Sequence, residues 1–212
     1  MNTAAIICNG EFPRKEYPRY LISKADYVVC CDGALEKYLK HFDRIPDLVI
    51  GDMDSLPRGL RKKYSGILLK VEEQDHNDQT KAVRHILSSC PDIDTIHIFG
   101  ATGLREDHTV GNLSLLMEYK RMFPAADVNI DIISDHGTAF AITDSIDLHV
   151  GEGRRVSLFS PDNSLTIKSI GLEWPTDDVR WDNWWKGTLN RATSDVVSLT
   201  FSHTSVALVI LD

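Results

Sequence analysis

The sequence is poor in cysteine and has no long apolar segment. Its four cysteines are Cys8, Cys30, Cys31 and Cys90, and no two of them have C-x-x-C spacing, so neither a disulfide framework nor a zinc site is expected. Residues 1–20 lack the apolar core of a signal peptide. No stretch approaches the roughly 18 consecutive apolar residues that a membrane span requires. We therefore expect a reduced, soluble protein of the cytoplasm that makes no contact with a membrane.

Positive charge is also scarce. The chain has 23 Lys and Arg residues against 31 Asp and Glu residues, a formal net charge of −8 at pH 7, which disfavours a surface that neutralises a nucleic-acid backbone. Aspartate outnumbers glutamate by 22 to 9, and aspartate favours turns, helix caps and metal sites over helix surfaces. At 212 residues the chain has room for one large domain or two modest ones.

Short apolar runs alternate with amphipathic segments in the first two-thirds of the chain. Six of these runs are expected to be buried strands: 4–8, 27–31, 48–50, 67–71, 95–99 and 128–133. Helical spacing of apolar residues predicts a helix over 82–90, capped by Asn77 or Asp78, and another over 110–117 after Asp107. Such alternation predicts an α/β fold with a mainly parallel, Rossmann-like sheet.

The pattern changes after about residue 138. Runs with period-two alternation recur between turn residues, at 145–150, 155–159, 165–170, 196–201 and 206–211. This spacing predicts a small all-β unit, a sandwich. We therefore divide the chain into an α/β domain of residues 1–138 and a β-sandwich domain of residues 139–212.

Polar and acidic residues follow the first five predicted strands. The segments are Asn9-Gly10, Asp32-Gly33, Gly51-Asp52-Met53-Asp54-Ser55, Gln74-Asp75-His76-Asn77-Asp78 and 100–108. The carboxyl ends of parallel strands meet at one edge of a sheet, where ligands bind. Clustered carboxylates favour a bound cation, and Asp52-x-Asp54 with Asp78 nearby suits Mg²⁺ that also contacts phosphate. The glycines allow close approach to phosphate, and Lys81 and Arg105 supply positive charge.

Each of these residues taken alone has an ordinary explanation. Asp78 and Asp107 are each at least as well explained as helix caps, and His76 and His108 as surface residues. The four tryptophans between Trp174 and Trp185 suit a dimer interface as well as a ligand. The joint placement of the carboxylates, glycines and arginine favours a functional site.

These residues, taken in order, resemble the thiamine pyrophosphokinase family. The matching segments are 31–34, 46–55, 74–81, 103–108 with Asn112-Leu113, 171–174, 187–189 and 193–195. The resemblance implies transfer of a pyrophosphoryl group from ATP to the hydroxyl of thiamine, which gives thiamine diphosphate and AMP in the presence of Mg²⁺. It also implies an α/β domain followed by a β-sandwich, in a homodimer with the active site near the subunit interface.

The resemblance assigns roles to individual residues. It places Mg²⁺ on Asp52, Asp54 and Asp78, and catalysis on Asp78, Arg105 and Asp107. It implies ATP contacts from Asn9, Gly10, Asp32, Gly33, Gln74, Lys81 and His108. It implies thiamine contacts from Thr193 and Ser194, with Trp174 as a cation–π partner of the thiazolium ring. The chain departs from the family pattern at Ala34, Leu35, Glu36, Asn77, Leu104, Asp195 and Val196.

Two other functions are compatible with parts of the sequence. The segment from Asp47 to Ser55 also resembles the first motif of haloacid-dehalogenase-like phosphatases, whose nucleophile would be Asp52 here. That motif normally lies on the first strand and continues with Gly-Thr, whereas here it follows the third predicted strand and continues with Ser55-Leu56. A thiamine- or nucleotide-binding sensor without catalysis is the non-enzymatic alternative.

Overall fold

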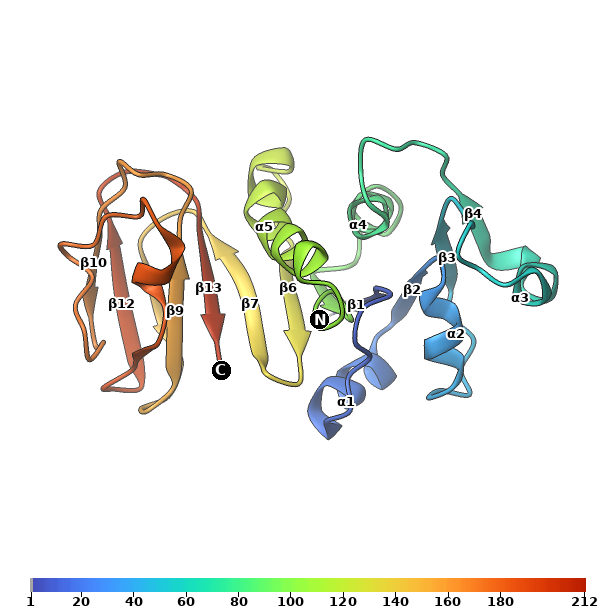
Figure 1. Cartoon of the computed structure of the whole chain (residues 1–212), viewed down its shortest axis with the longest axis horizontal. Coiled ribbons are helices and arrows are strands. Elements are labelled where there is room, and N and C mark those ends of the chain that lie inside the picture. Colours follow the sequence, from blue (N-terminus) through green and yellow to red (C-terminus); the bar gives the residue numbers. More distant parts are fainter. Residues whose placement is uncertain (1) are drawn as a thin grey trace. The chain divides into compact units, whose positions relative to one another are not determined.

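The computed structural model describes residues 2–212 and separates into two compact units (Figure 1). The first comprises the residues up to 115 together with 125–135, and the second comprises 116–124 and 136–212. The expected boundary between residues 138 and 139 falls within strand β7 (Gly137–Ile142). Within residues 2–212, no helix combines the length and the apolar character that crossing a bilayer needs.

The first unit contains a six-stranded sheet in the order β6-β5-β1-β2-β3-β4, with every pair parallel. Its strands are β1 (Thr3–Ile7), β2 (Tyr27–Cys31), β3 (Leu48–Gly51), β4 (Leu68–Lys70), β5 (Thr95–Phe99) and β6 (Asn129–Ser134). All six correspond to predicted strands. The chain proceeds from β1 outwards to β4 and then resumes at β5 on the other side of β1, which makes the region beside β1 a topological switch point.

Helices cover both faces of this sheet (Figure 1), which explains why its central strands β1, β2 and β3 are apolar and largely buried. The helices of this unit are α1 (Glu16–Lys24), α2 (Ala34–Leu39), α3 (Arg58–Lys63), α4 (Asp78–Ser89) and the first part of α5 (Glu106–Met122), whose residues from 116 belong to the second unit, with a 3₁₀ turn η1 (Ser65–Ile67). Alternate residues of β1 and β2, with one residue each from β3, β5 and β6, pack with α1 and α2 in one apolar core. Helix α4 packs on β1, β2 and β3 and lies on the opposite face from α2 (Figure 1).

The second unit consists of two antiparallel sheets around a shared apolar core. One has the order β11-β9-β13-β7 and the other β10-β12-β8. The strands after β7 are β8 (Ile146–His149), β9 (Arg155–Phe159), β10 (Ile167–Ile170), β11 (Asn190–Arg191), β12 (Val196–Phe201) and β13 (Ala207–Leu211), with a 3₁₀ turn η2 (Trp184–Gly187). The predicted α/β fold with a β-sandwich is confirmed, whereas β7 and β11 were not expected from the sequence.

Candidate active site

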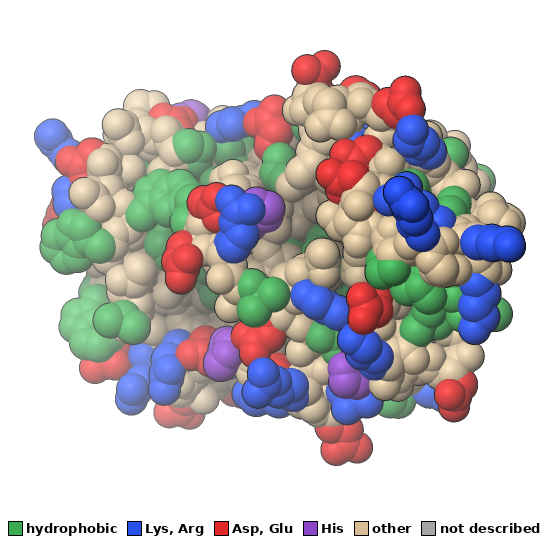
Figure 2. All heavy atoms as spheres, turned by 45° about the vertical axis from the view of Figure 1, so that its right-hand side comes forward, with side chains coloured by type: hydrophobic (Ala, Val, Ile, Leu, Met, Phe, Trp, Pro, Cys, Tyr) green, Lys and Arg blue, Asp and Glu red, His purple; other side chains and the backbone are tan. Residues whose placement is uncertain are grey.

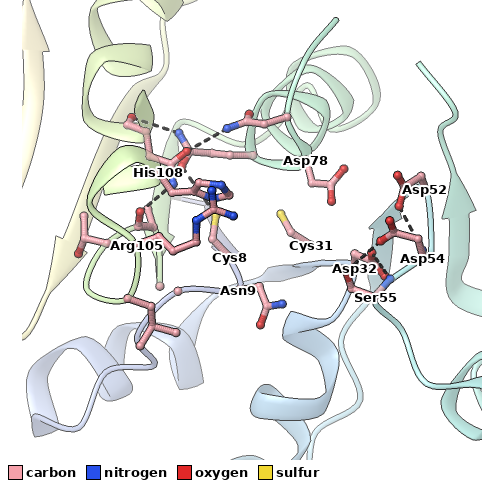
Figure 3. Close-up of a pocket in the computed structure, with 18 residues that line it drawn as sticks. Cys8, Asn9, Cys31, Asp32, Asp52, Asp54, Ser55, Asp78, Arg105 and His108 are labelled. Atoms are coloured by element: carbon pink, nitrogen blue, oxygen red, sulfur yellow. Dashed lines mark hydrogen bonds between the residues drawn. The ribbon is translucent and has the colours of Figure 1, made fainter. Parts of the chain in front are cut away.

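A cavity of about 510 Å³ opens at the carboxyl ends of β1, β2, β3 and β5 in the first unit (Figure 3). Its volume lies in the range of small-molecule sites. Eight of the residues expected in the site line it, namely Asn9, Gly10, Asp32, Asp52, Asp54, Asp78, Arg105 and His108. On the face drawn in Figure 2, Asp and Glu side chains lie among Lys and Arg side chains.

Three carboxylates gather at one end of the cavity. Asp32, Asp52 and Asp54 each offer an oxygen within 4.8 Å of the others. Asp32 is only 4% exposed, and its Oδ2 accepts a hydrogen bond of 3.0 Å from the backbone N–H of Ser55. Burial raises the pKa of Asp32. Asp52 accepts a bond of 3.1 Å from the backbone N–H of Asp54, and this bond lowers its pKa.

Unusual backbone conformations create this cluster. Asp32 has φ +41° and Met53 has φ +69°, in the left-handed region that costs about 1–3 kcal/mol for a residue other than glycine. Met53 is buried in the core beneath the sheet edge. With the middle residue buried, Asp52 and Asp54 line the cavity on either side of it.

The donor set fits a hard divalent cation. The Oδ1 atom of Asp32 is buried and has no hydrogen-bond partner among the described residues. Such an orphaned carboxylate oxygen is costly unless a cation contacts it, and carboxylates are the ligands that Mg²⁺ prefers. Mg²⁺ therefore fits Asp32, Asp52 and Asp54.

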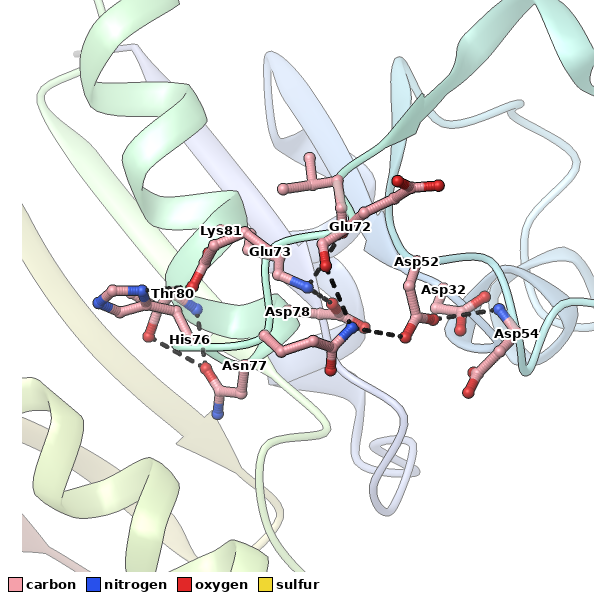
Figure 4. Close-up of polar contacts among 12 residues, drawn as sticks. Asp32, Asp52, Asp54, Glu72, Glu73, His76, Asn77, Asp78, Thr80 and Lys81 are labelled. Atoms are coloured by element: carbon pink, nitrogen blue, oxygen red, sulfur yellow. Dashed lines mark hydrogen bonds and ion pairs between the residues drawn. The ribbon is translucent and has the colours of Figure 1, made fainter.

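Asp78 lies beside this cluster but is paired differently (Figure 4). Its Oδ1 accepts a hydrogen bond of 3.2 Å from Nζ of Lys81, and burial raises its pKa. A Cβ placed on Gly51 would lie 2.9 Å from Oδ2 of Asp78 and 3.0 Å from Cβ of Asp32. Only glycine at position 51 therefore lets these two acidic residues approach so closely. The compact carboxylate triad contains Asp32 where the sequence hypothesis has Asp78.

The opposite side of the cavity is formed by glycine-rich backbone and an arginine. A Cβ on Gly10 would lie 2.3 Å from the carbonyl oxygen of Gly100, so the turn after β1 can pack against the turn after β5 only because residue 10 is glycine. Arg105 lines the cavity and donates two hydrogen bonds to Asp107, of 2.6 and 3.1 Å. Arg105 lowers the pKa of Asp107, which itself does not line the cavity.

The other three residues expected to contact ATP, which are Gly33, Gln74 and Lys81, do not line the cavity. Gln74 donates to Asp52 over 3.4 Å. Nζ of Lys81 contacts Asp78 and the carbonyl oxygen of Val71, each at 3.2 Å, so its charge is directed at a carboxylate. Gly33 is the N-cap residue of α2 and packs against the side chain of Asn9.

Several lining residues were not among the predicted site residues. They are Cys8, Cys31, Ser55, Asn77, Gln79, Gly100, Ala101, Thr102, Leu104 and Asn112. Cys8 and Cys31 are both buried. Gln79 and Asn112 are buried as well, and a polar residue at a buried helix position is the sequence signal that could have identified them.

The residues expected to contact thiamine lie in the second unit, where segments 171–174 and 190–194 run side by side. Trp174 is 56% exposed and lines a small hollow of about 160 Å³. Thr193 and Ser194 are exposed and do not line that hollow. The hydroxyl of Ser194 donates to the carbonyl oxygen of Val196 over 2.6 Å.

Carboxylates, glycine-rich turns and an arginine at the switch point of a parallel sheet are typical of α/β enzymes that act on phosphorylated ligands. Two family models match the chain. "Thiamin pyrophosphokinase, catalytic domain" matches residues 18–128, and "Thiamin pyrophosphokinase, substrate-binding domain" matches residues 137–209. The chain belongs to the thiamin pyrophosphokinase family.

Individual relatives agree with this assignment. Thiamine pyrophosphokinase 1 of Oryza sativa subsp. japonica is 25% identical over 206 residues, which cover 83% of this chain and 74% of the relative. Thiamine pyrophosphokinase of Bacillus subtilis is 31% identical over 140 residues, which cover 63% of each chain. The predicted family and its function, thiamine pyrophosphokinase, are confirmed, and neither the phosphatase nor the sensor alternative is favoured.

Solved structures share the fold. Thiamine pyrophosphokinase from Bacillus subtilis superposes with a TM-score of 0.79 at 20% identity, covering 100% of this chain and 99% of that chain. Yeast thiamin pyrophosphokinase gives a TM-score of 0.77 at 19% identity, covering 100% and 86%. The predicted fold class agrees with both.

Proposed function

We propose that the cavity of the first unit binds ATP together with Mg²⁺, and that a pyrophosphoryl group passes from this ATP to the hydroxyl of thiamine. The observation that carries the proposal is the triad Asp32, Asp52 and Asp54 beside a cavity of about 510 Å³, with one buried carboxylate oxygen left unpaired. Asp78, from the original metal hypothesis, is proposed to add negative charge beside the triad. Mg²⁺ bound there supplies charge neutralisation for the polyphosphate.

The remaining chemistry is positioning, because phosphoryl transfer requires little covalent participation from the protein. The thiamine oxygen forms a bond to the β-phosphorus, the bond from this phosphorus to the bridging oxygen of the α-phosphate breaks, and AMP leaves. The backbone at Asn9, Gly10 and Gly33 and the side chains of Arg105 and His108 are proposed to hold the nucleotide. Gln74 and Lys81 would act indirectly, by orienting Asp52 and Asp78 through their hydrogen bonds.

Asp107 is proposed to orient the attacking hydroxyl. Its low pKa, caused by Arg105, makes it a weak base but a good hydrogen-bond acceptor. The hydroxyl proton is then released late, to solvent water, once the new bond to phosphorus has formed. In the same role, Asp107 keeps the guanidinium of Arg105 oriented through its two hydrogen bonds.

We assign thiamine binding to the region of Trp174, Thr193 and Ser194, within the proposed sandwich domain of residues 139–212. The positively charged thiazolium would face Trp174, a contact worth about 1–2 kcal/mol. Exposed apolar side chains in the same unit, at Ile170, Trp184, Trp185 and Leu189, support a homodimer with the active site near the subunit interface. A cytoplasmic location, without nucleic-acid or membrane partners, stays a prediction from the sequence.

Product analysis tests the proposal directly. The protein is incubated with ATP, MgCl₂ and thiamine, and we expect AMP and thiamine diphosphate in equal amounts. Formation of ADP, or of phosphate without any requirement for thiamine, would contradict the proposal. Binding of both ligands without release of AMP would favour a sensor.

A further inference from the structure

Two asparagine side chains connect α4 to α5 at the wall of the cavity. The Nδ2 atom of Asn77 donates a hydrogen bond of 2.9 Å to Oδ1 of Asn112. Asn77 also caps α4, since its Oδ1 accepts bonds of 3.0 Å from the backbone N–H and from the hydroxyl of Thr80 (Figure 4). Both Nδ2 and Oδ1 of the Asn77 side chain therefore take part in hydrogen bonds.

Asn112 extends this connection to the turn after β5. It is 9% exposed, and its Nδ2 donates a hydrogen bond of 2.7 Å to the carbonyl oxygen of Ala101. The buried amide of Gln79, one residue into α4 from Asp78, supports Asn112 by donating to its carbonyl oxygen over 3.4 Å. The turn containing Ala101 carries Thr102, Leu104 and Arg105 to the cavity.

The same turn is also held by backbone hydrogen bonds to the turn after β1, and the hydroxyl of Thr109 bonds to it at Gly103 and Arg105. The N–H of Gly10 donates to Gly100 over 2.7 Å, and the N–H of Glu11 donates to Thr102 over 2.8 Å. The relay Asn77–Asn112–Ala101 is thus the side-chain counterpart of these bonds. It couples the start of α4, which presents Asp78, to the turn that presents Arg105.

We propose that Asn77 is a positioning residue. Through its hydrogen bond to Asn112 it holds the turn 100–105 at a fixed position relative to the acidic side of the cavity. The inference rests on the proposed function for its kinetic consequence, because a displaced turn would misplace Arg105 relative to the phosphates. Its structural consequence, a looser turn in the free protein, does not depend on that function. Among the hydrogen bonds of the described residues, Asn77 is connected to the turn through Asn112, so its effect on Arg105 is indirect.

The variant Asn77→Thr separates the two roles of this side chain. Threonine is a good N-cap residue, so the cap of α4 is retained, but its hydroxyl is too short to reach Asn112 as the amide does. We expect kcat/KM for ATP to fall about 5- to 10-fold, the effect of one buried hydrogen bond. The thiamine KM should stay within about 2-fold and Tm within about 2 °C of the wild type. Asn77→Ala, which loses the cap as well, should lower Tm further.

Hydrogen exchange of the full chain without substrates provides the readout that does not involve activity. In Asn77→Thr we expect the backbone amides of residues 100–105 to exchange several-fold faster, with the strands β1 and β5 unchanged. Asn163→Thr, the same substitution at an exposed turn of the second unit, is the matched control and should change neither exchange nor kinetics. In an Asn112→Leu background, Asn77→Thr should add less than about 2-fold to the kinetic loss.

Each contrary outcome has a distinct meaning. Unchanged exchange and unchanged ATP kinetics in Asn77→Thr would overturn the proposal. A kinetic loss without faster exchange at 100–105 would overturn it too, because Asn77 would then contact the nucleotide itself. A large fall in Tm together with a rise in both KM values would also overturn the proposal, because Asn77 would then only stabilise the fold. If the wild type produces no thiamine diphosphate, the proposed function fails. The hydrogen exchange of residues 100–105 in Asn77→Thr then still tests whether Asn77 positions this turn.

Discussion

Lys81 donates a hydrogen bond of 3.2 Å to Asp78 from a side chain that is only 5% exposed. The partner carboxylate is 28% exposed, so the ion pair joins the interior of α4 to the edge of the cavity. Removal of the Asp78 carboxylate would leave the buried ammonium group of Lys81 without a counter-charge, which would lower the stability of the fold. Lys81 thereby fixes the position of an acidic residue at the proposed ATP site and opposes the larger effect of burial, which raises the pKa of Asp78.

The substitution Lys81→Met is predicted to destabilise the fold by about 1–3 kcal/mol, since it leaves Asp78 half-buried without a counter-charge. The pKa of Asp78, already raised by burial, should rise further because Lys81 lowers it in the wild type. Urea denaturation at pH 7 measures the stability. The double variant Lys81→Met with Asp78→Asn should recover part of the loss, and an equal or greater loss would contradict a charge-pair mechanism.

Asp32 gives a prediction about Mg²⁺ and pH. Because burial raises the pKa of Asp32, the folded protein binds this proton more tightly than the unfolded chain does. Ionised Asp32 therefore lowers stability, and the loss develops as the pH rises from the ordinary aspartate pKa through the raised one. At pH 7 without metal, Asp32→Asn should consequently be at least as stable as the wild type.

Bound Mg²⁺ should offset this cost. Saturating MgCl₂ is expected to stabilise the wild type by about 1–3 kcal/mol at pH 7 and Asp32→Asn by much less. Asp54→Ala should show the same loss of the Mg²⁺ response and at least a 100-fold loss of AMP formation. Thermal scans with and without MgCl₂ provide the test, with Asp92→Asn, an exposed aspartate outside the cluster, as control. Equal Mg²⁺ responses in all four proteins would rule out the triad as the metal site.

Arg105 should matter for turnover and not for stability. The Arg105–Asp107 pair is largely exposed, at 66% and 64% of the two side chains, and exposed pairs contribute little to folding. Arg105→Ala is expected to lower kcat/KM for ATP about 100-fold while Tm stays unchanged. Arg105→Lys should recover only part, because lysine cannot form the two parallel hydrogen bonds to a phosphate. The matched control is Arg121→Ala, which removes another exposed pair of α5. A similar kinetic loss in that control would argue against a specific role.

The thiamine side of the reaction is tested at Trp174. Trp174→Leu should raise the thiamine KM about 5- to 30-fold, the equivalent of the cation–π contact, and leave the ATP KM unchanged. Ser194→Ala should raise the thiamine KM more than the ATP KM. Since the Ser194 hydroxyl is bonded to Val196, a fall in Tm with unchanged KM values would instead assign this hydroxyl to the turn.

Much of the fold was predictable because its signals are local. The strands β1, β2 and β3 are nearly continuous apolar runs, β5 and β6 alternate apolar with polar residues, and α4 carries an apolar stripe after a capping asparagine. The helix α3 was missed because it buries no residue and so has no apolar periodicity. The helix α1 begins after Lys15, whose side chain makes no cap, and contains Pro18. Two-residue β11 is too short for any alternation to show.

The sequence by itself determined the family, the two-part architecture and which strand ends carry acidic residues, since strand periodicity and the parallel sheet place those ends along one edge. Only the tertiary structure decided the partners within that edge. Left-handed backbone at Asp32 and Met53 brings Asp32 to Asp52 and Asp54, and packing of α4 near α5 joins Asn77 to Asn112. These contacts link different elements or depend on backbone dihedrals, which no periodicity along the chain encodes. The pair Lys81–Asp78 has the i,i+3 spacing of neighbours on a helix, and the structure adds that its lysine is buried.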